Sequence, residues 1–237
     1  MTTNSRILAH WLGIVILFAL IALGLRLGLE LRAKHRSDAL LLDLRNLSIG
    51  KSSAADVLQV ARRYDGPVAH GFMNCVDGDQ CYEIDSGLPR KLDQFMLHRV
   101  PLQRLTGLTP WFVEAALATT GGTLTSMRVH VGANAYDNPL DGLTEEVIAE
   151  DRPAYMAVQE NLRGAYRLQV EITQRASPEQ RALAFDFDLS CAIAYGGCHQ
   201  VCELMPSAWQ NYEQKPFTAG VPITADEIND PRCKRLP

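Results

Sequence analysis

The strongest hydrophobic pattern in the chain is an uncharged apolar run of 19 residues at positions 7–25. A helix of that length would be roughly 28 Å long, which matches the hydrocarbon core of a bilayer. Trp11 lies near one end, where an amphipathic ring prefers the membrane interface, and Arg26 marks the other end. A core helix of a soluble domain rarely stays apolar on every face over such a length. We therefore predict a transmembrane helix over residues 7–29, preceded by an N-terminal tail at 1–6.

The residues that end the apolar run indicate whether a signal peptidase removes this helix or whether it is retained. Ala22 and Gly24 are small residues at the spacing of a signal-peptidase site. The run is longer than the roughly 7–15 apolar residues of a cleaved signal, and leucines at positions 25, 27, 29 and 31 continue it. The pattern favours an uncleaved signal-anchor, with a cleaved signal peptide as the alternative.

Three pairs of alternating apolar and polar segments predict β-hairpins further along the chain. The pairs are residues 72–75 with 81–86, 111–119 with 123–132, and 166–174 with 183–189. Asp77-Gly78, Gly121-Gly122 and Ser177-Pro178-Glu179 supply the turns. Consecutive hairpins produce antiparallel sheet, and alternation leaves one apolar face for helices to cover. The predicted fold class is therefore α+β, with an N-terminal transmembrane helix and then a mainly antiparallel sheet of hairpins with short helices on one face.

The clearest soluble helix begins at Ser52 or Ser53, either of which offers an N-cap, and ends at Asp65-Gly66-Pro67. Residues 38–49 fit either a first strand or a continuation of the anchor helix, and Leu47 and Ile49 favour a strand. Further helices are expected within residues 92–99, 144–150, 153–162, 198–205 and 206–214. We assign residues 30–37 to a charged juxtamembrane linker, 38–213 to one α+β domain, and 214–237 to an irregular C-terminal tail.

One stretch of this domain resembles a known family. Residues 47–67 place a strand, Gly50, Ser52, a helix with Asp56-Val57, and then Gly66-Pro67, in the order found at the opening of the small lipoproteins of the bacterial outer-membrane assembly machinery. The lipidated cysteine with which that family begins is absent here, and any capped helix after a strand has the same order. We therefore name no homologue.

Charge is distributed unevenly along the chain. Residues 1–36 contain five basic residues and one acidic residue, whereas the remaining residues contain 18 basic and 26 acidic ones. An acidic body without a basic stripe argues against nucleic acid, or an anionic membrane surface, as a partner of that body. With 47% hydrophobic residues the chain can bury a core, so disorder is excluded for most of its length.

The cysteines are the candidate site residues, and their even number and spacing predict disulfides at Cys75, Cys81, Cys191, Cys198, Cys202 and Cys233. Cys75 and Cys81 face each other across the first predicted hairpin, so we expect a structural disulfide between them. Gly196-Gly197 could turn Cys191 towards Cys198, which leaves Cys202 for Cys233, although four cysteines permit three arrangements.

Other chemistry finds little support in the residues. A zinc site from Cys191, Cys198, His199 and Cys202 would suit the metal, but adjacent Cys198 and His199 diverge on a helix and paired C-x2-C spacing is missing. Asp77-Gly78-Asp79 is ordinary turn chemistry. The sequence contains no nucleotide-binding glycine motif and no G-x-S-x-G. We predict no catalytic residue, no metal and no cofactor.

Two arguments disagree about the side of the membrane on which the domain lies. Arg26, Arg32, Lys34 and Arg36 would keep it in the cytoplasm by the positive-inside tendency. Long domains translocate largely regardless of flanking charge, and paired cysteines favour an oxidising compartment. We therefore predict a single-pass protein of the cell membrane with most of the chain periplasmic or extracellular.

Two functional hypotheses follow. The first is a binding or structural role in the cell envelope, with the membrane met through one N-terminal helix and an envelope protein as partner. The second is an envelope enzyme, hydrolytic or thiol-based, whose catalytic residues are dispersed in sequence. The missing catalytic motifs favour the first.

Overall fold

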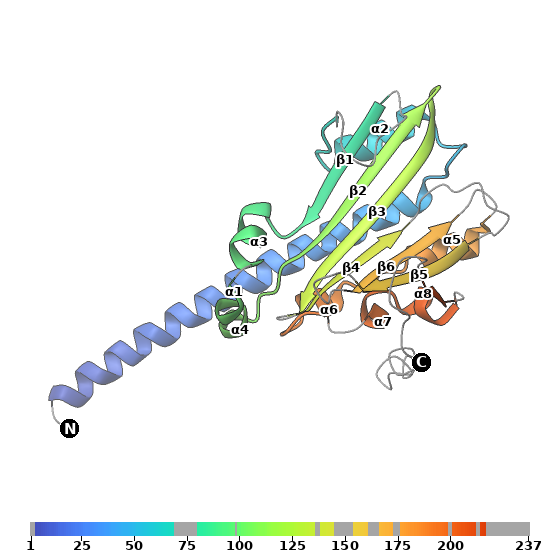
Figure 1. Cartoon of the computed structure of the whole chain (residues 1–237). Coiled ribbons are helices and arrows are strands. Elements are labelled where there is room, and N and C mark those ends of the chain that lie inside the picture. Colours follow the sequence, from blue (N-terminus) through green and yellow to red (C-terminus); the bar gives the residue numbers. More distant parts are fainter. Residues whose placement is uncertain are drawn as a thin grey trace.

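The computed structural model of the 237-residue chain describes residues 3–68, 80–97, 99–135, 138–144, 154–160, 166–172, 176–198, 201–211 and 214–216. Its longest element is α1, a single helix over Thr3–Asn46 (Figure 1). No proline interrupts this segment, so the apolar N-terminal helix continues directly into the domain. Leu47 and Ile49, for which the sequence favoured a strand, lie outside the strands of the structure, and both are buried.

The two halves of α1 differ in burial. From His10 to Leu25 nearly every residue is exposed. From Glu30 onward a buried stripe recurs at helical spacing and includes Ala33, Ser37, Leu40 and Leu44. The segment 30–37, expected to be a linker, is therefore part of the packed domain.

The strands form one seven-stranded sheet in the order β1-β2-β3-β4-β6-β5-β7. Their bounds are β1 Gln80–Gly87, β2 Trp111–Thr120, β3 Thr123–Ala135, β4 Asn138–Thr144, β5 Ala154–Glu160, β6 Tyr166–Ile172 and β7 Gln214–Pro216. β1 to β4 pair antiparallel, as do β5 and β6, whereas β4 with β6 and β5 with β7 pair parallel. The α+β class is as predicted.

The hairpin of β2 and β3 is confirmed. Gly121 and Gly122 both adopt positive φ at its turn, a backbone conformation that favours glycine. The predicted partner of β1, residues 72–75, lies outside the described residues.

The third predicted hairpin is wrong. Residues 178–184 form helix α5 (Pro178–Ala184), and β6 pairs with β4 and β5 instead. Ser177 caps α5: its hydroxyl accepts from the Gln180 N–H, and the Gln180 side chain accepts from the Ser177 N–H. The helix expected within 153–162 is also wrong, because Ala154–Glu160 is strand β5.

The remaining helices are short. α2 (Ala54–Arg63) is confirmed, with Ser53 and Asp56 forming a capping box. The helix expected within 92–99 appears as α3 (Arg90–Leu97), followed by α4 (Val100–Thr106). α6 (Ser190–Ile193), α7 (Val201–Leu204) and α8 (Pro206–Asn211) complete the set, while the stretch 144–150 lies almost wholly outside the described residues.

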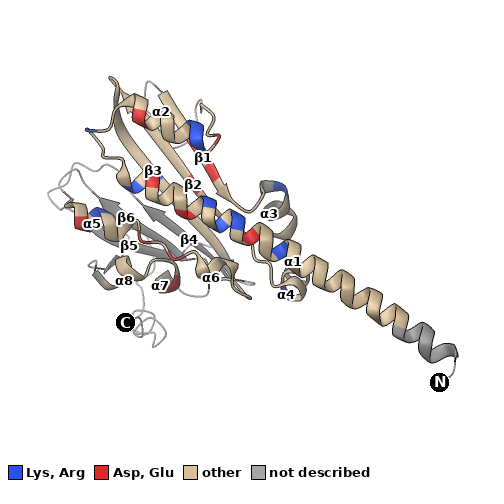
Figure 2. Ribbon diagram, turned by 180° about the vertical axis from the view of Figure 1, so that it is seen from behind, with Lys and Arg blue, Asp and Glu red and all other residues tan. Residues whose placement is uncertain are grey.

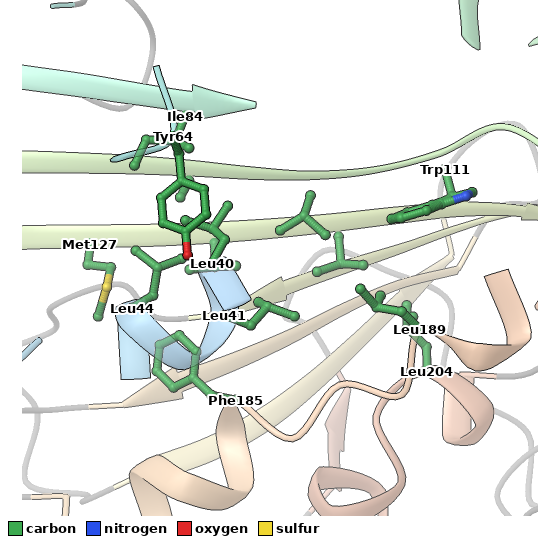
Figure 3. Close-up of a cluster of buried hydrophobic side chains, with 14 of the residues drawn as sticks. Leu40, Leu41, Leu44, Tyr64, Ile84, Trp111, Met127, Phe185, Leu189 and Leu204 are labelled. Carbon is green, nitrogen blue, oxygen red and sulfur yellow. The ribbon is translucent and has the colours of Figure 1, made fainter. Parts of the chain in front are cut away.

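The core lies between the buried half of α1 and one face of the sheet. Figure 2 shows α1 and α2 crossing the same face of β1–β3. In Figure 3, Leu40, Leu41 and Leu44 of α1 lie among side chains of other elements, including Tyr64, Ile84, Met127 and Phe185. All of these side chains are buried. The long helix thus supplies the central packing surface of the domain.

Candidate functional site

The predicted site residues are found in disulfides wherever the structure describes them. Cys191 is bonded to Cys198 with a Cα–Cα distance of 4.8 Å. Gly196 and Gly197 adopt positive φ between them, so the turn brings the two cysteines together as the spacing predicted. Cys81 and Cys202 are also disulfide-bonded. Cys75 and Cys233 lie outside the described residues, so the pairs Cys75 with Cys81 and Cys202 with Cys233 stay predictions.

Because Cys191 and Cys198 are bonded to each other, they are not available as zinc ligands. His199 lies outside the described residues. In the part of the chain that the structure describes, no group of three or more His, Cys, Asp or Glu side chains is arranged to hold a metal ion.

A site that the sequence did not predict lies where α1 enters the domain. Arg26 of α1 donates hydrogen bonds to the carbonyl oxygens of Thr106 and Gly107, the latter through Nη2 at 2.9 Å. Its Nε donates to Glu30 Oε2 at 3.2 Å. A guanidinium at the carbonyl end of α4 also suits the helix dipole. Arg26 therefore ties α4 to α1 at the residue that follows the exposed apolar run.

The carboxyl partner of Arg26 is buried. Glu30 is 1% exposed, and among the described residues its Oε1 has no hydrogen-bond partner. Burial raises the pKa of Glu30 above its ordinary value, and Arg26 opposes part of this shift. In the sequence, only the four-residue spacing of Arg26 and Glu30 pointed to this pair; their distant partners at α4 left no signal.

Gly107 completes this junction. It ends α4 with a φ of 67°, in the left-handed region. The ring of Tyr195 packs directly against it, and the Tyr195 hydroxyl donates to the Arg104 carbonyl oxygen at 2.5 Å. Helix α4 and the loop that carries Tyr195 are thus held together next to Arg26 of α1.

A second candidate is the face of β1–β3 away from α1. Glu114 of β2 and His130 of β3 are directly opposite, with Oε2 3.5 Å from Nδ1, and the His130 ring meets the edge of Phe112 at 5.0 Å between centroids. The described residues place no helix over this side of the three strands (Figure 1). Aromatic side chains such as Phe112 are enriched at contact surfaces.

A cavity of 340 Å³ between the end of α1 and α2 is the third candidate. Its charged groups take part in hydrogen bonds within the domain. Arg63 and the Tyr64 hydroxyl both donate to Asp43 Oδ2 at 2.8 Å, and Asp56 accepts from Ser53. We assign this cavity no ligand.

Comparison with protein-family models, with curated proteins and with solved structures found no match. Function is therefore inferred from the chain's own residues.

Proposed function

We propose that this protein is held in the cell membrane by the apolar half of α1, as an uncleaved signal-anchor, and that its disulfide-stabilised domain has a binding or structural role in the cell envelope. The observation that carries the proposal is the burial along α1. No residue in the most apolar 18-residue window of α1 is buried, whereas the C-terminal half of the same helix lies in the centre of the core.

Exposure of so many apolar side chains to water would be costly. The exposed ones N-terminal to Arg26 include Leu12, Val15, Ile16, Leu17, Phe18, Leu20, Ile21, Leu23 and Leu25. Full burial of each such side chain is worth about 1.5–3 kcal/mol. A bilayer would cover them on all faces of the helix at once, and the charged residues that begin at Arg26 and Glu30 fit a bilayer boundary at the start of the domain.

The disulfides support a place outside the cytoplasm, because such bonds persist in oxidising compartments. The face of β1–β3 that no described helix covers supports a binding role, with an envelope protein as partner. We do not propose the enzyme alternative, since no specific observation favours it.

Two substitutions on α1 test the membrane anchor with a matched control. Leu17 and Leu42 are almost equally exposed, at 57% and 56%, but only Leu17 lies in the proposed span. Leu17→Arg together with Leu20→Arg should impair insertion, since each central arginine costs about 2.5–3.5 kcal/mol on insertion scales. Leu42→Arg should have no such effect.

The readout is carbonate extraction of membranes, with an alkaline phosphatase fused after Pro237 to report the compartment. We expect wild type and Leu42→Arg to stay in the membrane pellet with active phosphatase. Release of the wild-type protein by carbonate would contradict the anchor. Retention in the pellet with an inactive phosphatase, and activity only from a cytosolic reporter at the same point, would reverse the compartment.

A further inference from the structure

The helical pair α3–α4 lies at the end of the domain from which the apolar half of α1 emerges. Arg26 holds the last turn of α4 at the position that follows Leu25, through its bonds to Thr106 and Gly107. Figures 1 and 2 show α3 and α4 on either side of α1 at this end. Whatever covers the apolar half of α1 therefore comes close to both short helices.

This end of the domain carries exposed apolar and aromatic side chains. Leu105 is 82% exposed, the highest value among the large hydrophobic residues that the structure describes. Tyr195 and Phe95 are also exposed, and the Tyr195 ring is held against Gly107. Aromatic rings with a polar edge favour the interface between lipid and water. We call Phe95, Arg99, Arg104, Leu105 and Tyr195 the junction surface.

The same segment is basic within an acidic domain. Residues 90–106 contain four basic residues and one acidic residue, which gives a net charge of +3, whereas residues 37–237 as a whole carry −8. Arg99 and Arg104 are exposed, and the Arg99 guanidinium stacks over the Phe95 ring at 4.0 Å. Arg32 is exposed on the neighbouring part of α1. This end of the domain therefore carries positive charge, in contrast to the acidic domain as a whole.

We infer that the junction surface rests on the bilayer that holds α1 and contacts anionic phospholipid headgroups. This inference depends on the proposed function, since it requires α1 to lie in the membrane. Leu105 and Phe95 enter the boundary between headgroups and acyl chains, and Arg99 and Arg104 pair with lipid phosphates. The contact sets the orientation of the domain relative to the membrane, because Arg26 ties the junction surface to the anchor helix.

Photo-cross-linking of the full-length protein in lipid nanodiscs tests the contact. Benzoylphenylalanine is placed singly at Leu105, at Leu42 or at Leu17, all of which are exposed leucines. The nanodiscs contain radiolabelled phosphatidylcholine with about 30% phosphatidylglycerol, or phosphatidylcholine alone. The measurement is the amount of lipid label bound to the protein after irradiation.

We expect strong lipid labelling at position 17, and labelling at position 105 about fivefold above that at position 42, because only the junction surface adjoins the bilayer. Omission of phosphatidylglycerol should lower labelling at position 105 at least about twofold and leave position 17 unchanged. Labelling at 105 no higher than at 42, with strong labelling at 17, would overturn the junction contact alone. Equal labelling at 105 in both lipid mixtures would overturn its preference for anionic lipid. No labelling at 17 would overturn the membrane anchor itself.

Discussion

The buried half of α1 is expected to contribute strongly to the stability of the domain, and Leu44 is the sharpest position at which to test this. Leu44 is fully buried at 0% exposure, and Figure 3 places it near Leu40 and Met127. Leu44→Ala removes three carbon groups, which at about 0.8 kcal/mol each lose about 2.4 kcal/mol of transfer free energy. A cavity that stays open raises the total to about 3–5 kcal/mol.

Leu42→Ala is the matched control, two residues away on the same helix. Leu42 is 56% exposed, so its truncation should change the free energy of unfolding by less than about 0.5 kcal/mol. Both variants remove the same atoms and change the helix propensity by the same amount, so the difference between them reports the effect of burial.

The assay is urea unfolding of the full-length protein in a mild detergent, followed by near-ultraviolet circular dichroism. Trp111, which is buried in the core, contributes to that signal. We expect a large fall in the urea midpoint for Leu44→Ala with an unchanged slope, and almost none for Leu42→Ala. Equal midpoints for the two variants would refute the assignment of this half of α1 to the core.

Three further predictions concern single interactions. Burial, together with a hydrogen bond to Asp43, raises the pKa of Tyr64 to about 12. The raised pKa keeps a stabilising contribution below pH about 10 that is lost as pH rises towards 12, so Tyr64→Phe should flatten the fall in urea midpoint over that window. Ser177→Ala should lower the free energy of unfolding by about 1 kcal/mol through loss of the α5 cap, and Ser177→Asn should restore most of it, both by urea titration. Replacing Cys191 and Cys198 by Ser should cost about 2–3 kcal/mol in the same titration, and peptide mapping that finds both thiols alkylated in the native protein would contradict the bond.

Local signals in the sequence predicted the elements that local chemistry determines. Ser53 and Asp56 fix the start of α2, and Gly121-Gly122 sets the turn between β2 and β3. The same logic applied at Ser177, where a capping serine, a proline and Gln180 follow each other. Alternation of four apolar residues from Leu183 to Leu189 predicted a strand, with Ser177-Pro178-Glu179 as the turn before it, whereas in the structure Ser177 caps a helix.

The contact between the exposed apolar half of α1 and the domain could not be predicted, because the residues that Arg26 binds are distant in sequence. Charges at Glu30 and Arg32 suggested a solvated linker. Glu30 is buried beside Arg26, which also binds the end of α4, and Ser37 is buried where its hydroxyl lies 2.8 Å from that of Ser86 on β1. Buried polar side chains are hydrogen-bonded, so burial of a polar residue on a helix can be predicted only when its hydrogen-bond partner is known. Strand β5 was predicted as a helix. Its pairing with β7 is distant in sequence, whereas its antiparallel partner β6 is the next strand along the chain, so a local hairpin was missed here.

Hydrogen–deuterium exchange of the full-length protein in lipid nanodiscs tests most directly that one helix runs from the bilayer into the core. Amides from His10 to Asn46 should exchange slowly without a break, the first part because lipid covers it and the second because it packs in the domain. Fast exchange over residues 30–37, between two protected segments, would show a flexible linker. Fast exchange over residues 10–25 would show that lipid does not cover the apolar half of α1, and either result would contradict the account.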